Sequence, residues 1–109
     1  MIADDRSFGS ARVVAGDHVA ADQSIVSSAL AFADAVRDAL RKHTQVEASF
    51  EGLKVAPSSY FNTFLQKLLE DVGLNVIGHE LNLTFATKIQ RAMFDRSYGT
   101  IQRLRSPNR

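Results

Sequence analysis

The chain has 109 residues, of which 45% are hydrophobic and 23% are charged, as expected for one globular domain that can bury its own core. It contains no cysteine, which excludes disulfides, thiol catalysis and thiolate metal sites. No run approaches the ~20 apolar residues that span a bilayer. The acidic start Met-Ile-Ala-Asp-Asp is unlike a secretory signal, so we expect a cytoplasmic protein.

The net charge of +1 is unevenly distributed along the chain. Residues 85–109 contain six basic residues and one acidic residue, a charge of +5, whereas the preceding 84 residues carry −4. The positive charge is therefore concentrated at the C-terminal end.

The N-terminal region predicts little regular structure before the first helix. We expect residues 1–10 to be disordered and residues 11–15 to form a short strand. Gly16-Asp17 is a turn signal, and Val19 would begin a second edge strand that forms a hairpin with the first.

A long amphipathic helix is predicted next, capped by Asp22 or by Ser24. Its alanines would let it lie close to a sheet, and basic residues gather near its end, as the helix dipole favours. Its apolar side chains recur at helical spacing, at Val26, Ala29, Leu30, Ala33, Val36 and Leu40.

The centre of the chain predicts a strand, a tight connection and a helix. Alternating apolar and polar residues indicate a half-buried strand over residues 46–50. Gly52 permits a turn, and Pro57 disfavours helical structure in the residue before it. A helix is predicted over residues 58–72, closed by Gly73. Its apolar stripe consists of Phe61, Phe64, Leu65, Leu68, Leu69 and Val72.

The remaining residues predict one more strand and one more helix. The strand is expected over residues 74–81, directly after the preceding helix, as short connections in α/β units allow. Asn82 or Thr84 would cap the last helix, which fades near residues 97–99. Its apolar positions are Phe85, Ile89, Ala92, Met93 and Phe94.

Helices and strands alternate after the first strand region, which predicts parallel pairing through crossover connections. With the N-terminal strand or hairpin added, we expect an α/β domain with a small mixed β-sheet and about three amphipathic helices mainly on one face. This domain would cover residues 11–99, and residues 100–109 would form a basic C-terminal tail.

Ser58 and Ser59 lie at the predicted start of the second long helix. Either hydroxyl can cap free backbone N–H groups, and this interpretation requires no further function. The alternative is a regulated site. A helix N-terminus carries about half a positive charge and unsatisfied donors, so it accommodates a phosphate on such a serine.

The run FEGLKVAPSSYFNTFLQKLLEDVG resembles the central strand, loop and helix of the STAS-like family of unknown function. That family is related to the STAS domains of bacterial anti-sigma factor antagonists. The shared pattern is Phe50-Glu51-Gly52-Leu53 followed by Ser58-Ser59-Tyr60-Phe61. The resemblance covers residues 46–73 and continues more loosely to about residue 99.

The resemblance implies a STAS-like fold and a protein-interaction module without catalysis of its own. In the antagonists a partner kinase phosphorylates the matching serine, which would be Ser58 here, with Ser59 second. Two positions depart from the pattern: Pro57 replaces an aspartate, and Tyr60 replaces a glycine. The resemblance therefore supports the fold more strongly than it supports the phosphorylation switch.

Patterns for catalysis and cofactor binding are sparse. His18, His43 and His79 show no metal-ligand spacing, and the sequence contains no dinucleotide-binding or P-loop motif. Glycines are scarce around the serines, so no nucleophile elbow is present. We expect no enzyme activity, no metal and no cofactor.

The basic C-terminal region allows two interpretations. Positive charge and one aromatic ring are typical of a weak phosphate-contacting patch, here at Lys88, Arg91, Tyr98, Arg103 and Arg105. The sparse spacing and the isoelectric point of about 8.2 favour a solvated helix face and tail.

Our first functional hypothesis is a regulatory module that binds a partner protein through Ser58, Ser59, Tyr60 and Asn62. By resemblance, the partner would be a serine kinase or anti-sigma factor of the histidine-kinase-like ATPase type. The alternative hypothesis is a nucleic-acid-associated accessory protein that uses the basic C-terminal region. An edge strand in a small open sheet also makes a homodimer plausible.

Overall fold

Three parallel strands form the sheet of the computed structural model, which describes residues 9–22, 24–53, 56–70 and 72–105. The strands are β1 (Ser10–Val14), β2 (Gln45–Ser49) and β3 (Leu81–Thr84), in the order β1-β2-β3. Ser10 pairs with Gln45 and Val46 pairs with Leu81, both in parallel register. The central strand β2 therefore holds the sheet together.

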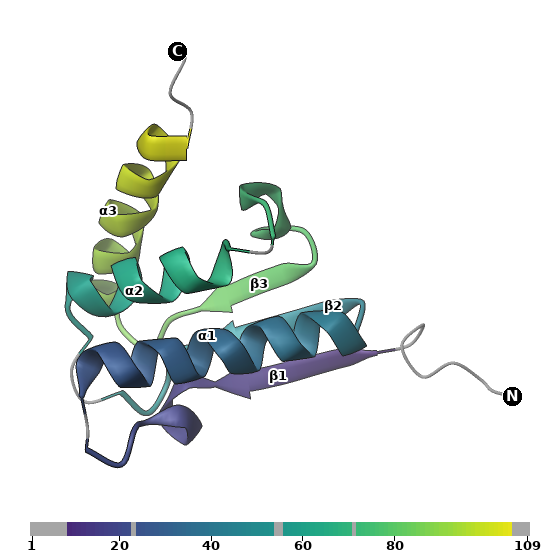
Figure 1. Cartoon of the computed structure of the whole chain (residues 1–109), viewed down its shortest axis with the longest axis horizontal. Helices are drawn as coiled ribbons and strands as arrows, with labels where there is room; N and C mark the ends of the chain where they lie inside the picture. Colours follow the sequence, from purple (N-terminus) through teal and green to yellow (C-terminus); the bar gives the residue numbers. More distant parts are fainter. Residues whose placement is uncertain (1–8, 23, 54–55, 71, 106–109) are drawn as a thin grey trace, which may run out of the picture.

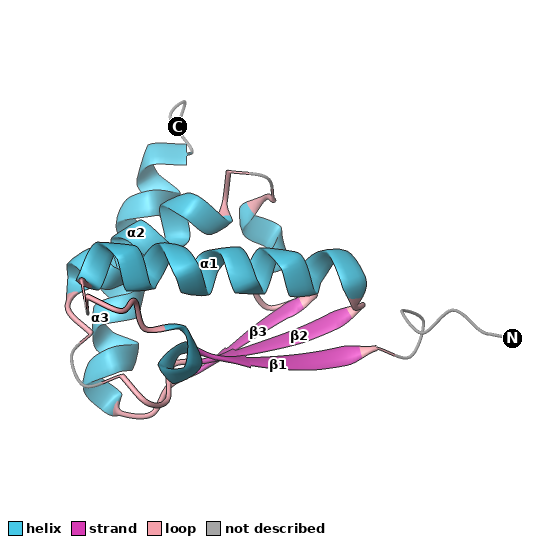
Figure 2. Cartoon of the chain, turned by 60° about the horizontal axis from the view of Figure 1, so that its bottom comes forward, coloured by secondary structure: helices cyan, strands magenta, loops and turns pink. Residues whose placement is uncertain are grey.

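Two helices provide the crossovers between successive strands. Helix α1 (Ile25–Lys42) connects β1 to β2, and α2 (Ser58–Leu68) connects β2 to β3. Both lie over the same face of the sheet (Figure 2). Helix α3 (Lys88–Arg105) begins just beyond the carboxyl end of β3 and rises past α2, against which it packs (Figure 1).

The covered face of the sheet carries the apolar side chains of all three strands. Ala11, Val46 and Leu81 occupy one register position, and the residues two further along continue the same face. The opposite face carries the alternate side chains, which are mostly polar. This alternation explains why the helices gather on one side.

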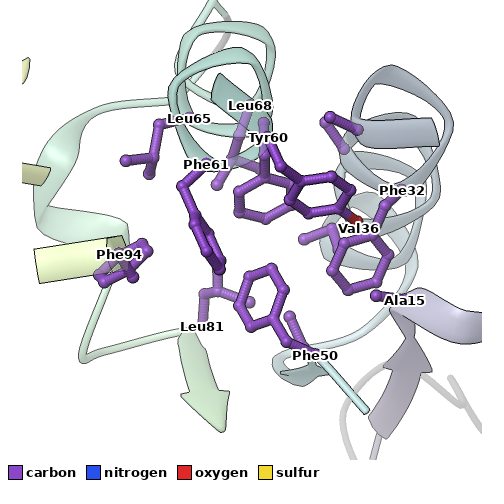
Figure 3. Close-up of a cluster of buried hydrophobic side chains, with 14 of the residues drawn as sticks. Ala15, Phe32, Val36, Phe50, Tyr60, Phe61, Leu65, Leu68, Leu81 and Phe94 are labelled. Carbon is purple, nitrogen blue, oxygen red and sulfur yellow. The ribbon is translucent and has the colours of Figure 1, made fainter. Parts of the chain in front are cut away.

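Phe50, which follows β2 and is fully buried, lies at the centre of an aromatic core (Figure 3). Its ring centroid is 5.1 Å from that of Phe61 and 5.4 Å from that of Phe32. The other rings around it belong to Tyr60, Phe64 and Phe85. The end of β2, α1 and α2 thus all pack around the Phe50 side chain.

The predicted α/β class is confirmed, and so are the strand near residues 46–50 and the helix cap at Ser24. The Oγ of Ser24 accepts a hydrogen bond from the backbone N–H of Ser27 at 3.2 Å. The expected mixed sheet is wrong, because both strand pairings are parallel.

No hairpin forms at Val19 within the described residues. Instead a short 3-10 helix, η2 (Ala15–His18), follows β1 directly. The backbone N–H of Gly16 donates to the carbonyl of Glu51 at 2.9 Å, which ties the chain to the end of β2 and turns it away from the edge.

The strand predicted over residues 74–81 is also wrong. Leu74–Val76 forms the 3-10 helix η3, and Gly78 adopts a φ of 91° in the turn before β3. This left-handed glycine interrupts the extended chain, so the strand begins only at Leu81. Helix α2 ends at Leu68, and Gly73, with a φ of −85°, is not its left-handed closing residue.

The boundaries of α3 differ from those predicted. Thr87, not Asn82 or Thr84, caps it by accepting a hydrogen bond from the N–H of Gln90 at 3.0 Å. The helix continues to Arg105, so residues 100–105 are not a tail, and Ile101 docks with 5% exposure. At the other end, Ser10 belongs to β1. Residues 1–8 and 106–109 of the predicted termini lie outside the described residues.

Candidate functional site

The connection from β2 to α2 is fixed by a contact between two glycines. Gly52 has a φ of 84°, a conformation that favours glycine. A β-carbon on Gly52 would lie 2.8 Å from the Cα of Gly16, so the two backbones can approach this closely only because neither residue has a side chain. This contact sets the direction in which the chain leaves the sheet toward α2.

Helix α2 starts without a side-chain cap. Its N-cap residue is Pro57, which offers no hydroxyl or carboxylate, and no acidic residue occupies the first turn. The capping interpretation of the two serines is therefore wrong, because Ser58 and Ser59 are already the first two helical residues. The positive end of the helix dipole is left without a negative partner in its own first turn.

The four predicted site residues differ in exposure. Ser59 is exposed, whereas Ser58 and Asn62 are half-buried. The carbonyl of Ser58 accepts a hydrogen bond from the Oγ of Ser97 at 3.3 Å, which ties the start of α2 to α3. Ser59 is therefore the serine that an approaching protein reaches most easily.

Tyr60, expected on the partner-binding surface, belongs to the core instead. It is 1% exposed, and its ring packs edge-on against Phe50 and Phe61. The hydroxyl oxygen is buried and has no hydrogen-bond partner among the described residues. Burial raises the pKa of the phenol well above its ordinary value, because the charged form loses its hydration. Tyr60 can anchor the first turn of α2, but it cannot meet a partner.

Replacing Tyr60 with phenylalanine is expected to raise the free energy of unfolding by about 1 kcal/mol at neutral pH. The ring stays in place while a buried hydroxyl without a partner, which costs about 1–3 kcal/mol, is removed. Urea denaturation measures the change. The control is Tyr98→Phe, on a half-buried ring stacked on Phe94, which should have little effect. A loss of stability in Tyr60→Phe would contradict the unpartnered hydroxyl.

The same variant should differ from the wild type at alkaline pH. Below the ordinary phenol pKa of 10.0, Tyr60 is protonated in both the folded and the unfolded chain. Above it the unfolded chain loses the proton first, so the wild-type free energy of unfolding should fall by up to about 1.4 kcal/mol per pH unit. Denaturation should be measured between pH 9 and 12, roughly one unit below to two units above that pKa. Over this range the free energy of unfolding should fall less steeply for Tyr60→Phe than for the wild type.

A second polar cluster, which the sequence analysis did not single out, lies on the open face of the sheet. Arg12 of β1 contacts Glu47 at 3.4 Å and Glu51 at 3.2 Å, and Thr84 of β3 donates to Glu47 at 3.1 Å. Hydrogen bonds to Glu51 and then Glu47 raise the pKa of Arg12. Alternation within each strand places Arg12, Glu47 and Thr84 on one face, but which strands are neighbours depends on the parallel register, and Glu51 lies beyond the end of β2.

The three histidines lie on three different segments of the chain. His18 stacks on Phe32 with ring centroids 6.1 Å apart, His43 follows α1, and the Nδ1 of His79 is 2.7 Å from the carbonyl oxygen of Asn75. In the part of the chain that is described, no group of three or more His, Asp or Glu side chains is placed to hold a metal ion. None of its helices has the length and apolarity needed to cross a membrane.

The predicted basic patch is only partly assembled. Arg91 pairs with Asp95 at 3.5 Å, and its guanidinium lies 5.5 Å from the centre of the Phe85 ring. Tyr98 stacks on Phe94 and is half-buried, so the one aromatic residue of the patch faces the body of the protein. Lys88 and Arg103 are exposed, while the Arg105 side chain lies outside what is described.

Comparison with protein-family models, with curated proteins and with solved structures gives no match for this chain. The resemblance to STAS-like domains therefore stays an interpretation of the residues quoted above.

Proposed function

We propose that this chain is a non-catalytic protein-interaction module, and that phosphorylation in the first turn of α2 regulates it. The observation that carries the proposal is the uncapped start of α2. It has no side-chain cap and no acidic residue, and it has two serine hydroxyls at its first two positions. A phosphate there gains from the helix dipole and from free backbone donors.

The exposure of the two serines reverses their order as candidates for phosphorylation. Ser59 is exposed and becomes the first candidate, while Ser58 is half-buried beside α3 and becomes the second. A phosphate on Ser59 would add nearly two negative charges at the surface without entering the core. Asn62, one turn further along the same side of α2, completes the binding surface, and Tyr60 supports it from below.

The partner that fits this proposal is a protein that distinguishes the phosphorylated from the unmodified serine. By resemblance it is a serine kinase or anti-sigma factor of the histidine-kinase-like ATPase type, acting in the cytoplasm. Added charge would change the affinity of such a partner by repulsion and desolvation, while the domain itself keeps its fold.

Intact mass measurement and site mapping of the protein isolated from its native host test this proposal. We expect a population that carries one phosphate, lost in Ser59→Ala or, if the second serine is used, in Ser58→Ala. Ser27→Ala is the matched control, because Ser27 is an exposed serine in the first turn of α1. A wholly unmodified population across several growth states, or a phosphate that persists when both α2 serines are replaced, would overturn it.

A further inference from the structure

The basic side chains of β1, α1 and α2 are neutralised by neighbouring carboxylates. Each lies within 3.8 Å of an aspartate or glutamate oxygen, as found for Arg12, Arg37, Arg41, Lys42 and Lys67. Helix α3 differs. Lys88, Arg96 and Arg103 make no ion pair with any described residue, and the only side-chain partner of Arg103 is the Thr100 hydroxyl at 3.3 Å. The unpaired positive charge is thus concentrated on one helix.

These three cations share one side of α3. At 100° per residue, Lys88, Arg96 and Arg103 fall within about 80° of one another on the helix surface. The buried residues of α3 occupy the opposite side, at Gln90, Phe94, Ser97 and Ile101. We call the outward side, defined by Lys88, Arg96 and Arg103, the basic face of α3.

The basic face extends along most of α3. Fifteen residues separate its first and last cation, which corresponds to about 22 Å along the helix axis. Ala92 and Gly99, which lie between the cations on this side, are small, so an extended partner can approach all three charges at once. The exposed Asp95 lies about 20° from Lys88 on the helix surface, and its carboxylate is paired with Arg91 at 3.5 Å.

A depression at the start of α3 continues the basic face. Its volume is about 470 Å³. It is lined by the polar residues Thr84, Thr87, Lys88 and Arg91 and by the apolar residues Leu83, Phe85 and Ala86. The first turn of α3 contains no acidic residue. An anion in this depression would therefore face the unpaired Lys88, the Asp95-paired Arg91 and the positive end of an 18-residue helix.

We propose that the basic face of α3 binds the phosphate backbone of double-stranded nucleic acid without reading its sequence. Guanidinium and ammonium groups spaced along a straight line are suited to the regular phosphates of a duplex. Single strands are held largely by stacking of bases on exposed aromatic rings. Here Phe85 is covered by Arg91, and Tyr98 stacks on Phe94, so neither ring offers a free face on this side.

The burial pattern of α3 also argues against a lipid surface as the occupant. A helix that lies on a membrane inserts a continuous apolar face into it. The apolar face of α3 is already used, because Phe94 and Ile101 are buried in the core. The aliphatic side chains left outside, Ile89 and Leu104, stand near opposite ends of the helix.

The test is binding of the full chain to a short labelled duplex of random sequence, followed by fluorescence anisotropy at several salt concentrations. With about three phosphate contacts, the logarithm of the association constant should fall with the logarithm of salt with a slope near −2.7. The triple variant Lys88→Gln/Arg96→Gln/Arg103→Gln should bind at least about tenfold more weakly at low salt, with a slope near zero.

A charge-matched control distinguishes binding by the basic face from an effect of net charge alone. Arg12→Gln/Arg41→Gln/Lys42→Gln removes the same three positive charges from exposed but ion-paired positions, and should bind as the wild type does. Circular dichroism checks that both variants are folded. Equal weakening in both variants, no duplex binding by the wild type at low salt, or binding to anionic vesicles in place of the duplex would each overturn the proposal. None of these outcomes depends on whether Ser58 or Ser59 is phosphorylated.

Discussion

Replacing Phe50 with alanine is expected to lower the free energy of unfolding by about 3–5 kcal/mol. The side chain is fully buried and contacts aromatic rings from α1, from α2 and from the residue after β3. Its removal would leave a cavity where these elements meet, and flanking rings cannot close it without leaving their own positions. Chemical denaturation followed by circular dichroism measures the loss.

Two further substitutions identify the cause of that loss. Phe50→Leu retains most of the buried volume and should cost less than about 1.5 kcal/mol. Ile89→Ala removes an aliphatic side chain that is 70% exposed, and should change the free energy of unfolding by less than about 0.5 kcal/mol. If Phe50→Ala costs no more than Ile89→Ala, Phe50 is not at the centre of the core.

Gly52→Ala is expected to cost about 2–5 kcal/mol, for two separate reasons. The positive φ of 84° disfavours any residue with a β-carbon, by about 1–2 kcal/mol. The new methyl group would also lie 2.8 Å from the Cα of Gly16, and one backbone would have to move at a further cost of about 1–3 kcal/mol.

The chain contains a control for each of these two terms. Gly78 has a φ of 91° but open space around it, so Gly78→Ala should show only the conformational cost. Gly16 makes the same close approach without a left-handed φ, so Gly16→Ala should show only the steric cost. If Gly52→Ala proves no more destabilising than Gly78→Ala, the close approach of Gly52 to Gly16 is wrong.

Local sequence patterns predicted the elements whose signals are strong and continuous. Helix α1 has a clear apolar stripe and a serine cap, and β2 has clean alternation, so both were located to within a residue or so. The third strand was misplaced because the run from residue 74 is apolar but does not alternate. Leu81 and Leu83 alternate with Asn82 and Thr84, which is the better strand signal and marks β3.

The candidate site was predicted less well, because it depends on single-residue boundaries and on contacts between distant segments. Whether Ser58 caps α2 or is its first residue depends on a shift of the helix boundary by one position, which residue propensities do not resolve. The burial of Tyr60 does have a signal in the sequence, because Tyr60 precedes Phe64 and Leu68 at spacings of four on the same helix stripe. Which cations lack a carboxylate partner depends on the tertiary structure, so no pattern in the sequence identifies them.

The uniform parallel register has a consequence for the order in which a growing chain can fold. Ser10 pairs with Gln45 and Val46 pairs with Leu81, so each strand must wait for one that is synthesised 35 residues later. Until β2 leaves the ribosome, β1 has no partner, and α1 has only part of the surface it covers. The sheet is completed only when β3 follows, which makes the time between the synthesis of β2 and β3 the period of greatest exposure to misassembly.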